Sequence, residues 1–318
     1  MVQLSDTEIR RVAVIGAGTI GAGWAAYFLA HGLDVAISDP APDARDRVAR
    51  RIDEAWPVLE RLGLAPGSSP DRWRFHADPS VAADGCDFCQ ENAPERYEVK
   101  IELLRRLDRA LPREVVIASS SSGLLISRLQ EHCNYPERCV IGHPFNPPHI
   151  VPLVEIVGGL KTGQKAIAAA LAFYRAIGKH PIEIRREVPG HLANRLQAAL
   201  WREAVHLVAE GVATVEDVDA AISEGPGLRW ALMGPHLTFA LAGGSGGMSH
   251  FMSHLAPAVS SWWPGLGTPG LSDDVKRRLI DGVETEMAGR SLGDLERRRD
   301  DFLVRVLEAR RAVEPPES

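Results

Sequence analysis

The chain has 318 residues, with 36 Lys and Arg against 42 Asp and Glu, which gives a net charge of −6. Hydrophobic residues make up 45% and charged residues 25%, close to the averages for globular proteins. These values exclude disorder, collagen-like repeats and a coiled coil, and the charge excludes the basic footprint of a nucleic-acid-binding protein. The length predicts two domains.

Two further features concern the cellular setting. No apolar run reaches the roughly 18 residues that a membrane span needs, so we expect no membrane partner. The N-terminal sequence MVQLSDTEIRR has no apolar signal-peptide segment, and four cysteines are too few for a disulfide scaffold. We therefore expect a cytoplasmic protein.

Short β-branched runs alternate with helical segments through the first half of the chain. This alternation predicts a mainly parallel sheet with helices on both faces. The predicted strands are 11–16, 34–39, 72–77, 86–91, 115–119, 139–143, 151–157 and 181–185. The predicted helices between them are 20–31, 43–62, 98–111 and 164–177. The apolar stripe of helix 98–111 is formed by Val99, Leu103, Leu104, Leu107 and Leu111.

The character of the sequence changes at Pro189, after which the β-branched runs stop. Helices are predicted at 192–211, 215–222 and 291–312, with Thr214 as an N-cap and Asp217 at the capping-box position. We therefore predict an α/β domain over residues 1–188 and an all-helical domain over 189–318.

A glycine-rich turn joins the first predicted strand to the first helix. Its pattern is G-x-G-x-x-G, which predicts a Rossmann-type doubly wound domain with pyrophosphate at the helix N-terminus. The turn residues assigned to the cofactor are Gly16, Gly18, Thr19, Ile20 and Gly21. Asp39 ends the next strand, 18 residues after Gly21, where a carboxylate binds ribose hydroxyls and favours NAD over NADP.

This region allows one alternative to a cofactor site. The glycines could serve packing alone, but the strand, the helix and the acid around them favour the cofactor. Glu91, at the end of the strand predicted over 86–91, is also assigned to cofactor binding.

Polar residues follow the strands of the central part of the chain. Strand 115–119 leads into a serine run that ends at Ser122, and strand 139–143 delivers His143. Open α/β sheets bind ligands at the carboxyl ends of their strands. A lone histidine is more often structural, but Glu155 on the returning strand could pair with the imidazole and fix its tautomer. His143 is therefore a candidate acid/base.

These motifs together resemble a known family. Besides the glycine motif they are 118–122 (ASSSS), 143–147 (HPFNP), 153–155 (LVE) and 189–195 (PGHLANR). In this order they are similar to the 3-hydroxyacyl-CoA dehydrogenase superfamily, over nearly the whole chain. The resemblance implies a Rossmann domain followed by a helical domain that forms a homodimer.

The resemblance also implies roles for individual residues. His143 would be the acid/base and Glu155 its partner, while Ser122 and Asn194 would contact and orient the reacting oxygen of the substrate. The position after Ser122 is often a second serine in the acyl-CoA branch of the family, but here it is Gly123.

The second half of the chain resembles the L-carnitine dehydrogenase branch, in 225–230 (GPGLRW), 233–235 (MGP), 241–244 (LAGG) and 289–292 (GRSL). This implies NAD-dependent oxidation of the 3-hydroxyl of L-carnitine to 3-dehydrocarnitine. Because aromatic faces suit a quaternary ammonium and arginine a carboxylate, Trp230 and Arg229 are assigned to the substrate, although core packing and a solvated ion pair would also explain them.

Three alternatives stay open at this point. Two are other substrates, L-gulonate and a short-chain 3-hydroxyacyl-CoA. The third is a non-catalytic NAD-binding protein, which the intact set of Ser122, His143, Glu155 and Asn194 disfavours. No metal site is expected.

Overall fold

The computed structural model describes residues 9–313. The chain divides between Asn194 and Arg195 into two compact units, and each is described by itself. None of the helices within residues 9–313 has the length and apolarity needed to cross a membrane.

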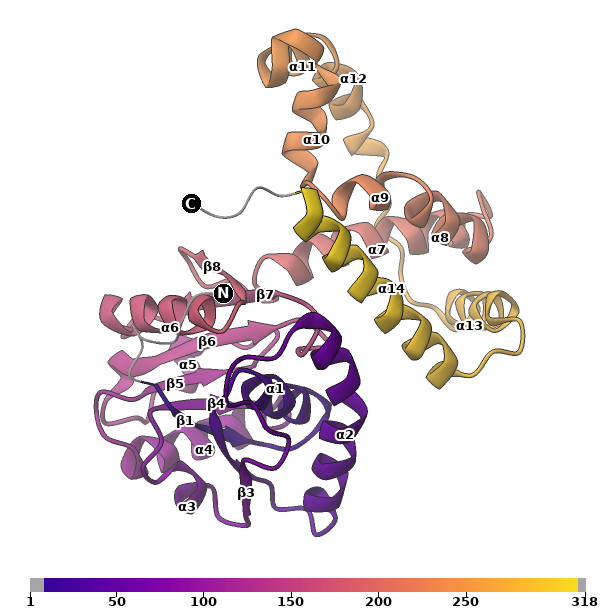
Figure 1. Cartoon of the computed structure of the whole chain (residues 1–318). Coiled ribbons are helices and arrows are strands. Elements are labelled where there is room, and N and C mark those ends of the chain that lie inside the picture. Colours follow the sequence, from indigo (N-terminus) through magenta and orange to yellow (C-terminus); the bar gives the residue numbers. More distant parts are fainter. Residues whose placement is uncertain (1–8, 314–318) are drawn as a thin grey trace. The chain divides into compact units, whose positions relative to one another are not determined.

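The first unit is built on one eight-stranded sheet (Figure 1). Its strands are β1 (Arg11–Ile15), β2 (Asp34–Ser38), β3 (Trp73–His76), β4 (Phe88–Glu91), β5 (Val116–Ser119), β6 (Cys139–Pro144), β7 (Leu153–Gly158) and β8 (His180–Ile184). The order is β3-β2-β1-β4-β5-β6-β7-β8. All neighbouring strands are parallel except β6 and β7. The chain order reverses between β1 and β4, which is where sheets of this type bind ligands.

Helices cover both faces of this sheet. One face packs against α1 (Thr19–Ala30), α2 (Ala44–Leu62) and α6 (Gln164–Ala176), and the other against α3 (Pro79–Ala83), α4 (Tyr97–Ala110) and α5 (Ile126–Leu129). These two apolar layers are the core of the unit. The sequence-based prediction of an α/β, Rossmann-type fold is confirmed.

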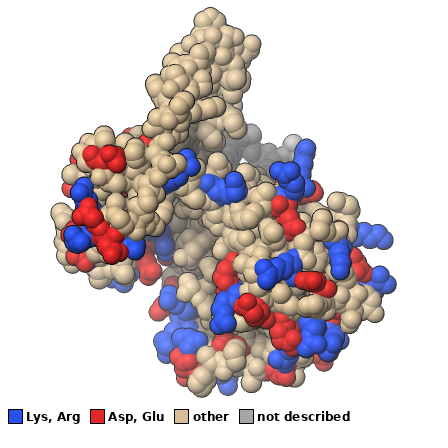
Figure 2. Space-filling model, turned by 180° about the vertical axis from the view of Figure 1, so that it is seen from behind, with Lys and Arg blue, Asp and Glu red and all other residues tan. Residues whose placement is uncertain are grey.

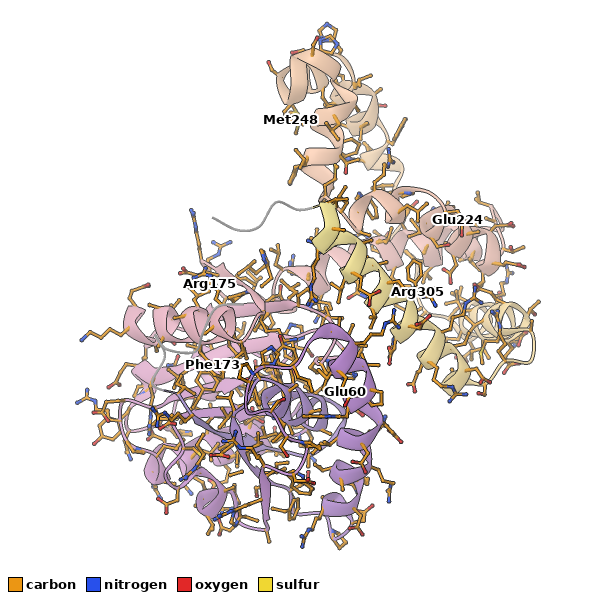
Figure 3. The ribbon with its side chains drawn as sticks, in the orientation of Figure 1. Glu60, Phe173, Arg175, Glu224, Met248 and Arg305 are labelled. Atoms are coloured by element: carbon orange, nitrogen blue, oxygen red, sulfur yellow. The ribbon has the colours of Figure 1, made fainter. Side chains whose placement is uncertain are left out.

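Aromatic residues dominate the face that α1 and α6 cover. Trp24 stacks on Phe28 with 5.1 Å between ring centroids, and Phe88 of β4 lies 4.2 Å from Phe173 of α6. Figure 3 shows the two sides of α6, because Phe173 points into the unit and Arg175 points away from it. Burying rings of this size stabilises the unit by about 1.5–3 kcal/mol for each side chain.

The second unit is entirely helical within residues 195–313. Its α-helices are α7 (Ala193–Ala209), which begins two residues before the unit, α8 (Val215–Ser223), α9 (Pro226–Trp230), α10 (Pro235–Ala242), α11 (Gly247–His254), α12 (Ala256–Ser261), α13 (Asp273–Met287) and α14 (Leu292–Val313), with short 3-10 helices at Gly244–Gly246 and Trp263–Gly265. The predicted capping box is confirmed, because the Asp217 amide donates to Thr214 Oγ1 at 3.1 Å and the Thr214 amide is paired with the Asp217 carboxylate.

Few apolar side chains of this second unit are buried. Its buried cluster consists of Val208, Val215 and Val218, with partly buried neighbours around it. Residues 230–272 contain no Lys, Arg, Asp or Glu. The part of the second unit that holds α10, α11 and α12 in Figure 1 is therefore drawn without blue or red residues in Figure 2.

Candidate active site

The glycine-rich turn lies directly after β1, and its backbone needs the glycines. Gly16 has φ of +94°, and a Cβ on it would lie 2.7 Å from the Asn92 carbonyl carbon. A Cβ on Gly21 would lie 1.8 Å from the Gly16 oxygen. Nothing lies within 4 Å of the place where a Cβ of Gly18 would be. The turn is therefore closed toward the sheet and open outward at the start of α1, which fits a pyrophosphate on the helix N-terminus.

Asp39 holds this turn from the end of β2. Its Oδ2 accepts from the Ala17 amide at 2.8 Å, and its Oδ1 accepts from the Ala41 amide at 2.9 Å. Each carboxylate oxygen has a second acceptor site, and the side chain is only partly buried. Asp39 therefore remains suited to ribose hydroxyls at the position where the sequence predicts it.

Glu91 lies at the end of β4, but its side chain is fully buried. Lys100 of α4, also buried, donates to both of its carboxylate oxygens at 2.9 and 3.0 Å, and Ser119 donates to Oε2. Glu91 therefore connects the end of β4 to the end of β5 and to α4. Its assignment to cofactor binding stays a prediction.

Glu95 organises the serine run that follows β5. Its Oε1 accepts from the amides of Ser122 and Gly123 at 2.8 and 3.0 Å, and from Ser121 Oγ at 2.8 Å. The Ser122 carbonyl in turn accepts from Asn194 Nδ2 at 3.0 Å. Two of the predicted catalytic residues, Ser122 and Asn194, are thus brought together.

His143 and Glu155 face each other across the antiparallel pair β6 and β7. His143 Nδ1 lies 2.8 Å from Glu155 Oε2, and the two side chains are almost completely buried. Glu155 Oε1 accepts from the amides of Leu192 and Ala193 at 3.0 and 2.8 Å. Every oxygen of this buried carboxylate therefore has a donor.

The charge state of this pair follows from its contacts. Burial by itself raises the pKa of Glu155, but the hydrogen bonds from His143, Ala193 and Leu192 outweigh it and lower the pKa below its usual value. An anionic Glu155 accepts the proton of His143 Nδ1, which leaves Nε2 as the acceptor in the neutral ring. Such a pair can take a proton from an alcohol, with Glu155 stabilising the imidazolium that forms.

Arg229 and Trp230, the predicted substrate residues, end the short helix α9 in the second unit. Both side chains are exposed. Their assignment to a carboxylate and a quaternary ammonium stays a prediction.

Several residues of the site were not predicted from the sequence. Glu95 and Asn92 follow β4 at the carboxyl edge of the sheet. That position is the one feature of the sequence that could have indicated their part in the site. Asn92 accepts from Ser120 Oγ at 2.7 Å, and its amide donates to the Ile15 carbonyl at 2.6 Å. It thereby ties the glycine turn to the serine run. Lys100 carried no signal, since a lysine on an amphipathic helix normally faces solvent.

Comparison with known families decides the assignment. Residues 11–188 match the 3-hydroxyacyl-CoA dehydrogenase NAD-binding domain, and residues 190–262 match the C-terminal domain of the same family. The chain belongs to the 3-hydroxyacyl-CoA dehydrogenase family. This confirms the predicted family and NAD as the cofactor, and with them an NAD-dependent dehydrogenase.

Individual members of the family align over almost the whole chain. The L-carnitine dehydrogenase of Streptomyces coelicolor is 50% identical, with 98% of each chain covered. That of Pseudomonas putida is 50% identical over 95% of this chain and 94% of its own. Among solved structures, 5-formyl-3-hydroxy-2-methylpyridine 4-carboxylic acid 5-dehydrogenase, described as an NAD+-dependent dismutase, has a TM-score of 0.83 and 32% identity, with 96% of this chain and all of that chain covered.

Proposed function

We propose that this chain catalyses the NAD-dependent oxidation of the 3-hydroxyl of L-carnitine to 3-dehydrocarnitine. The observation that carries the proposal is the buried His143–Glu155 pair at the carboxyl edge of an NAD-binding sheet. The substrate is supported by the L-carnitine dehydrogenases that are similar to this chain from end to end.

Each residue has a separate part in this reaction. His143 Nε2 takes the hydroxyl proton, and Glu155 keeps the opposite ring nitrogen protonated and balances the charge. Ser122 and Asn194 orient the reacting oxygen. Asp39 and the turn from Gly16 to Gly21 hold NAD, which accepts the hydride when bound.

We further propose that the helical part from Pro189 onward binds the substrate and pairs two copies of the chain. Trp230 offers an exposed aromatic face for the quaternary ammonium, and Arg229 a cation for the carboxylate. We place the activity in the cytoplasm, where all four cysteines, which are free thiols here, stay reduced.

The test follows NADH formation by absorbance with three substrates side by side, namely L-carnitine, L-gulonate and 3-hydroxybutyryl-CoA. The proposal expects turnover of L-carnitine well above the other two. Preference for either of the others would reassign the substrate within the family. Bound NAD with no turnover of any of them would favour a non-catalytic NAD-binding protein.

A further inference from the structure

His191 lies in a backbone conformation that few side chains adopt. It has φ of +51° and follows Gly190 at +76°, in a turn closed by the His191 amide on the Val188 carbonyl at 3.0 Å. Among residues 9–313, only Ala288 is another non-glycine residue with positive φ. The left-handed region costs an L-residue about 1–2 kcal/mol, so contacts of the side chain must hold His191 there.

The imidazole of His191 is buried and makes one directed contact. Only 1% of the residue is exposed, and Nε2 lies 2.9 Å from the Ser121 carbonyl oxygen. Because a carbonyl oxygen only accepts, Nε2 carries the proton. Nδ1 has no hydrogen-bond partner among the described residues.

The charge of this ring follows from the groups that face it. Burial, the largest effect, and the nearby His143 lower the pKa of His191, while the Ser121 carbonyl and the carboxylates of Glu155 and Glu95 oppose them. The net direction is downward. His191 is therefore neutral at neutral pH, with a lone pair on Nδ1.

The segment that begins with His191 links the two halves of the active site. The ring centroids of His191 and His143 are 5.5 Å apart. The amides after His191 bind Glu155 Oε1, and the Asn194 side chain binds the Ser122 carbonyl. His191 itself binds the serine run one residue earlier, at Ser121. The buried contact between His191 and Ser121 therefore helps to connect the serine run to the His143–Glu155 pair.

We propose that His191 is a positioning residue of the dehydrogenase site, which ties the serine run to the His143–Glu155 pair through its Nε2–H donor and which acts uncharged. An uncharged ring matters because His143 becomes an imidazolium when it takes the hydroxyl proton. A second cation beside it would oppose that step. The proposal rests on the proposed function for its reaction and on the contacts above for its geometry.

Three variants separate positioning from a merely structural role. His191→Gln keeps an N–H donor without a titrating ring, His191→Phe keeps a ring without a donor, and His191→Gly accepts the positive φ without a side chain. We expect His191→Gln to keep kcat for L-carnitine within about threefold. We expect His191→Phe and His191→Gly to lose about 10- to 100-fold in kcat, since small misplacements cost that much, with NAD affinity unchanged.

The pH profile supplies a readout that stability alone would not move. Protonation of His191 contributes to the fall of kcat on the acid side in the wild type, so that limb should move to lower pH in His191→Gln. Wild-type kcat in both His191→Phe and His191→Gly would overturn the proposal. So would equal losses of kcat, NAD affinity and melting temperature in all three variants.

A measurement without substrate keeps this inference separate from the proposed function. Nitrogen NMR of histidine-labelled protein reports the tautomer of His143, which should stay Nδ1–H in His191→Gln and lose that preference in His191→Gly. If the wild type does not oxidise L-carnitine and this difference is still observed, the substrate assignment fails and the positioning role stands. An unchanged His143 signal in every variant refutes the positioning role.

Discussion

His143 has two ring nitrogens, and Glu155 determines which of them carries the proton. The carboxylate is completely buried, so it would be protonated or expelled if its oxygens lacked donors. The backbone amides of Leu192, just before α7, and of Ala193, its first residue, provide these donors together with one imidazole N–H. The acid/base therefore depends on a segment that lies 37 to 38 residues further along the chain.

Glu155→Gln should lower kcat for L-carnitine by at least about a hundredfold, because general acid–base catalysis contributes about 10²–10⁴-fold and the amide no longer balances the imidazolium. The size of the side chain is kept, so NAD binding, measured by fluorescence titration, should not change. His143→Ala is the matched control, with turnover abolished and NAD still bound. A kcat in Glu155→Gln close to that of the wild type would contradict the assigned role of Glu155.

At the scale of elements, Lys179, which precedes β8, anchors the loop between β6 and β7 by hydrogen bonds to its backbone. Its ammonium donates to the Val151 carbonyl at 2.9 Å and to the Pro148 carbonyl, and it lies 3.7 Å from the centre of the Tyr27 ring. Burial keeps the pKa of Lys179 well below its usual value. This loop begins next to His143, so its anchoring concerns the site as well as the fold.

Lys179→Met should lower the free energy of unfolding by about 2–4 kcal/mol, because one buried and one partly buried carbonyl lose their donor and each unpaired buried group costs about 1–3 kcal/mol. Urea denaturation followed by circular dichroism measures this loss. Lys165→Met is the control, since Lys165 lies on the exposed face of α6 and should change stability little. Equal stability of the two variants would show that Lys179 does not anchor the loop.

His31, which follows α1, makes the free energy of unfolding depend on pH. Burial, the largest effect, lowers the pKa of His31 to about 4 from 6.5, against the opposing hydrogen bond to the Tyr27 carbonyl. Between these values the unfolded chain binds a proton that the folded chain does not. The free energy of unfolding should therefore fall as the pH drops from 6.5 to about 4, by up to about 3 kcal/mol.

Urea unfolding at a series of pH values tests this sign. His31→Gln should flatten the fall between pH 6.5 and 4, because the unfolded chain no longer gains that proton. His132→Gln, at an exposed position, is the control and should leave the slope as in the wild type. A slope in His31→Gln as steep as that of the wild type would exclude His31 as its source.

The strands and the longer helices of the first unit could be predicted because their patterns are local, whereas the short helices α3 and α5 were not predicted. All eight predicted strands exist, and the His143–Glu155 pairing follows from two strands that are consecutive in the chain. The predicted stripe of α4 was only partly correct. Lys100 and Asp108 are buried on this helix, because Glu91 and Arg138 pair with them. Such partners come from other elements, so periodicity does not reveal them.

The same distinction separates the predicted from the missed parts of the site. The glycine turn and His143 belong to short motifs, whereas Glu95 reaches the serine run 26 to 28 residues later through side-chain contacts. The left-handed backbone of His191 depends on a contact 70 residues away. The bounds of the short helices α9 to α12 were not predicted, since their glycines and prolines are also loop signals.

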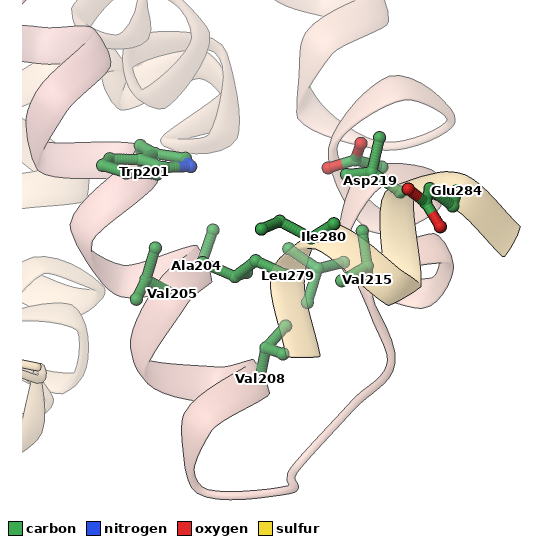
Figure 4. A pocket seen from close by; sticks show the side chains of 11 residues that line it. Trp201, Ala204, Val205, Val208, Val215, Asp219, Leu279, Ile280 and Glu284 are labelled. Atoms are coloured by element: carbon green, nitrogen blue, oxygen red, sulfur yellow. The ribbon is translucent and has the colours of Figure 1, made fainter. Parts of the chain in front are cut away.

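At the scale of the whole molecule, the second unit exposes the kind of surface that associating proteins bury. Trp262 and Trp263 are 64% and 66% exposed, in the stretch 230–272 that has no charged residue. A hollow of about 480 Å³ lies between α7, α8 and α13 (Figure 4). Its lining is mostly apolar, with Trp201 and Ile280 among its members and Asp219 and Glu284 beside them.

We expect a second copy of the chain to cover the exposed tryptophans and this hollow, as the proposed homodimer requires. Size-exclusion chromatography with light scattering should give twice the 34.6 kDa of one chain. Ile280→Glu, at a position 57% exposed in the single chain, should raise the dimer dissociation constant at least about a hundredfold. A carboxylate without a partner costs several kcal/mol when an interface buries it.

The charges already present make this variant a sharp probe, because Asp219 and Glu284 line the same hollow and a third carboxylate adds repulsion to the cost of burial. The control is Leu160→Glu, at a residue of the first unit that is 91% exposed, which should leave the mass unchanged. Loss of L-carnitine turnover in step with the loss of the dimer would show that pairing also completes the substrate site. A wild-type mass of one chain at every concentration would refute the dimer, and a dimer that Ile280→Glu leaves intact would place the contact elsewhere than this hollow.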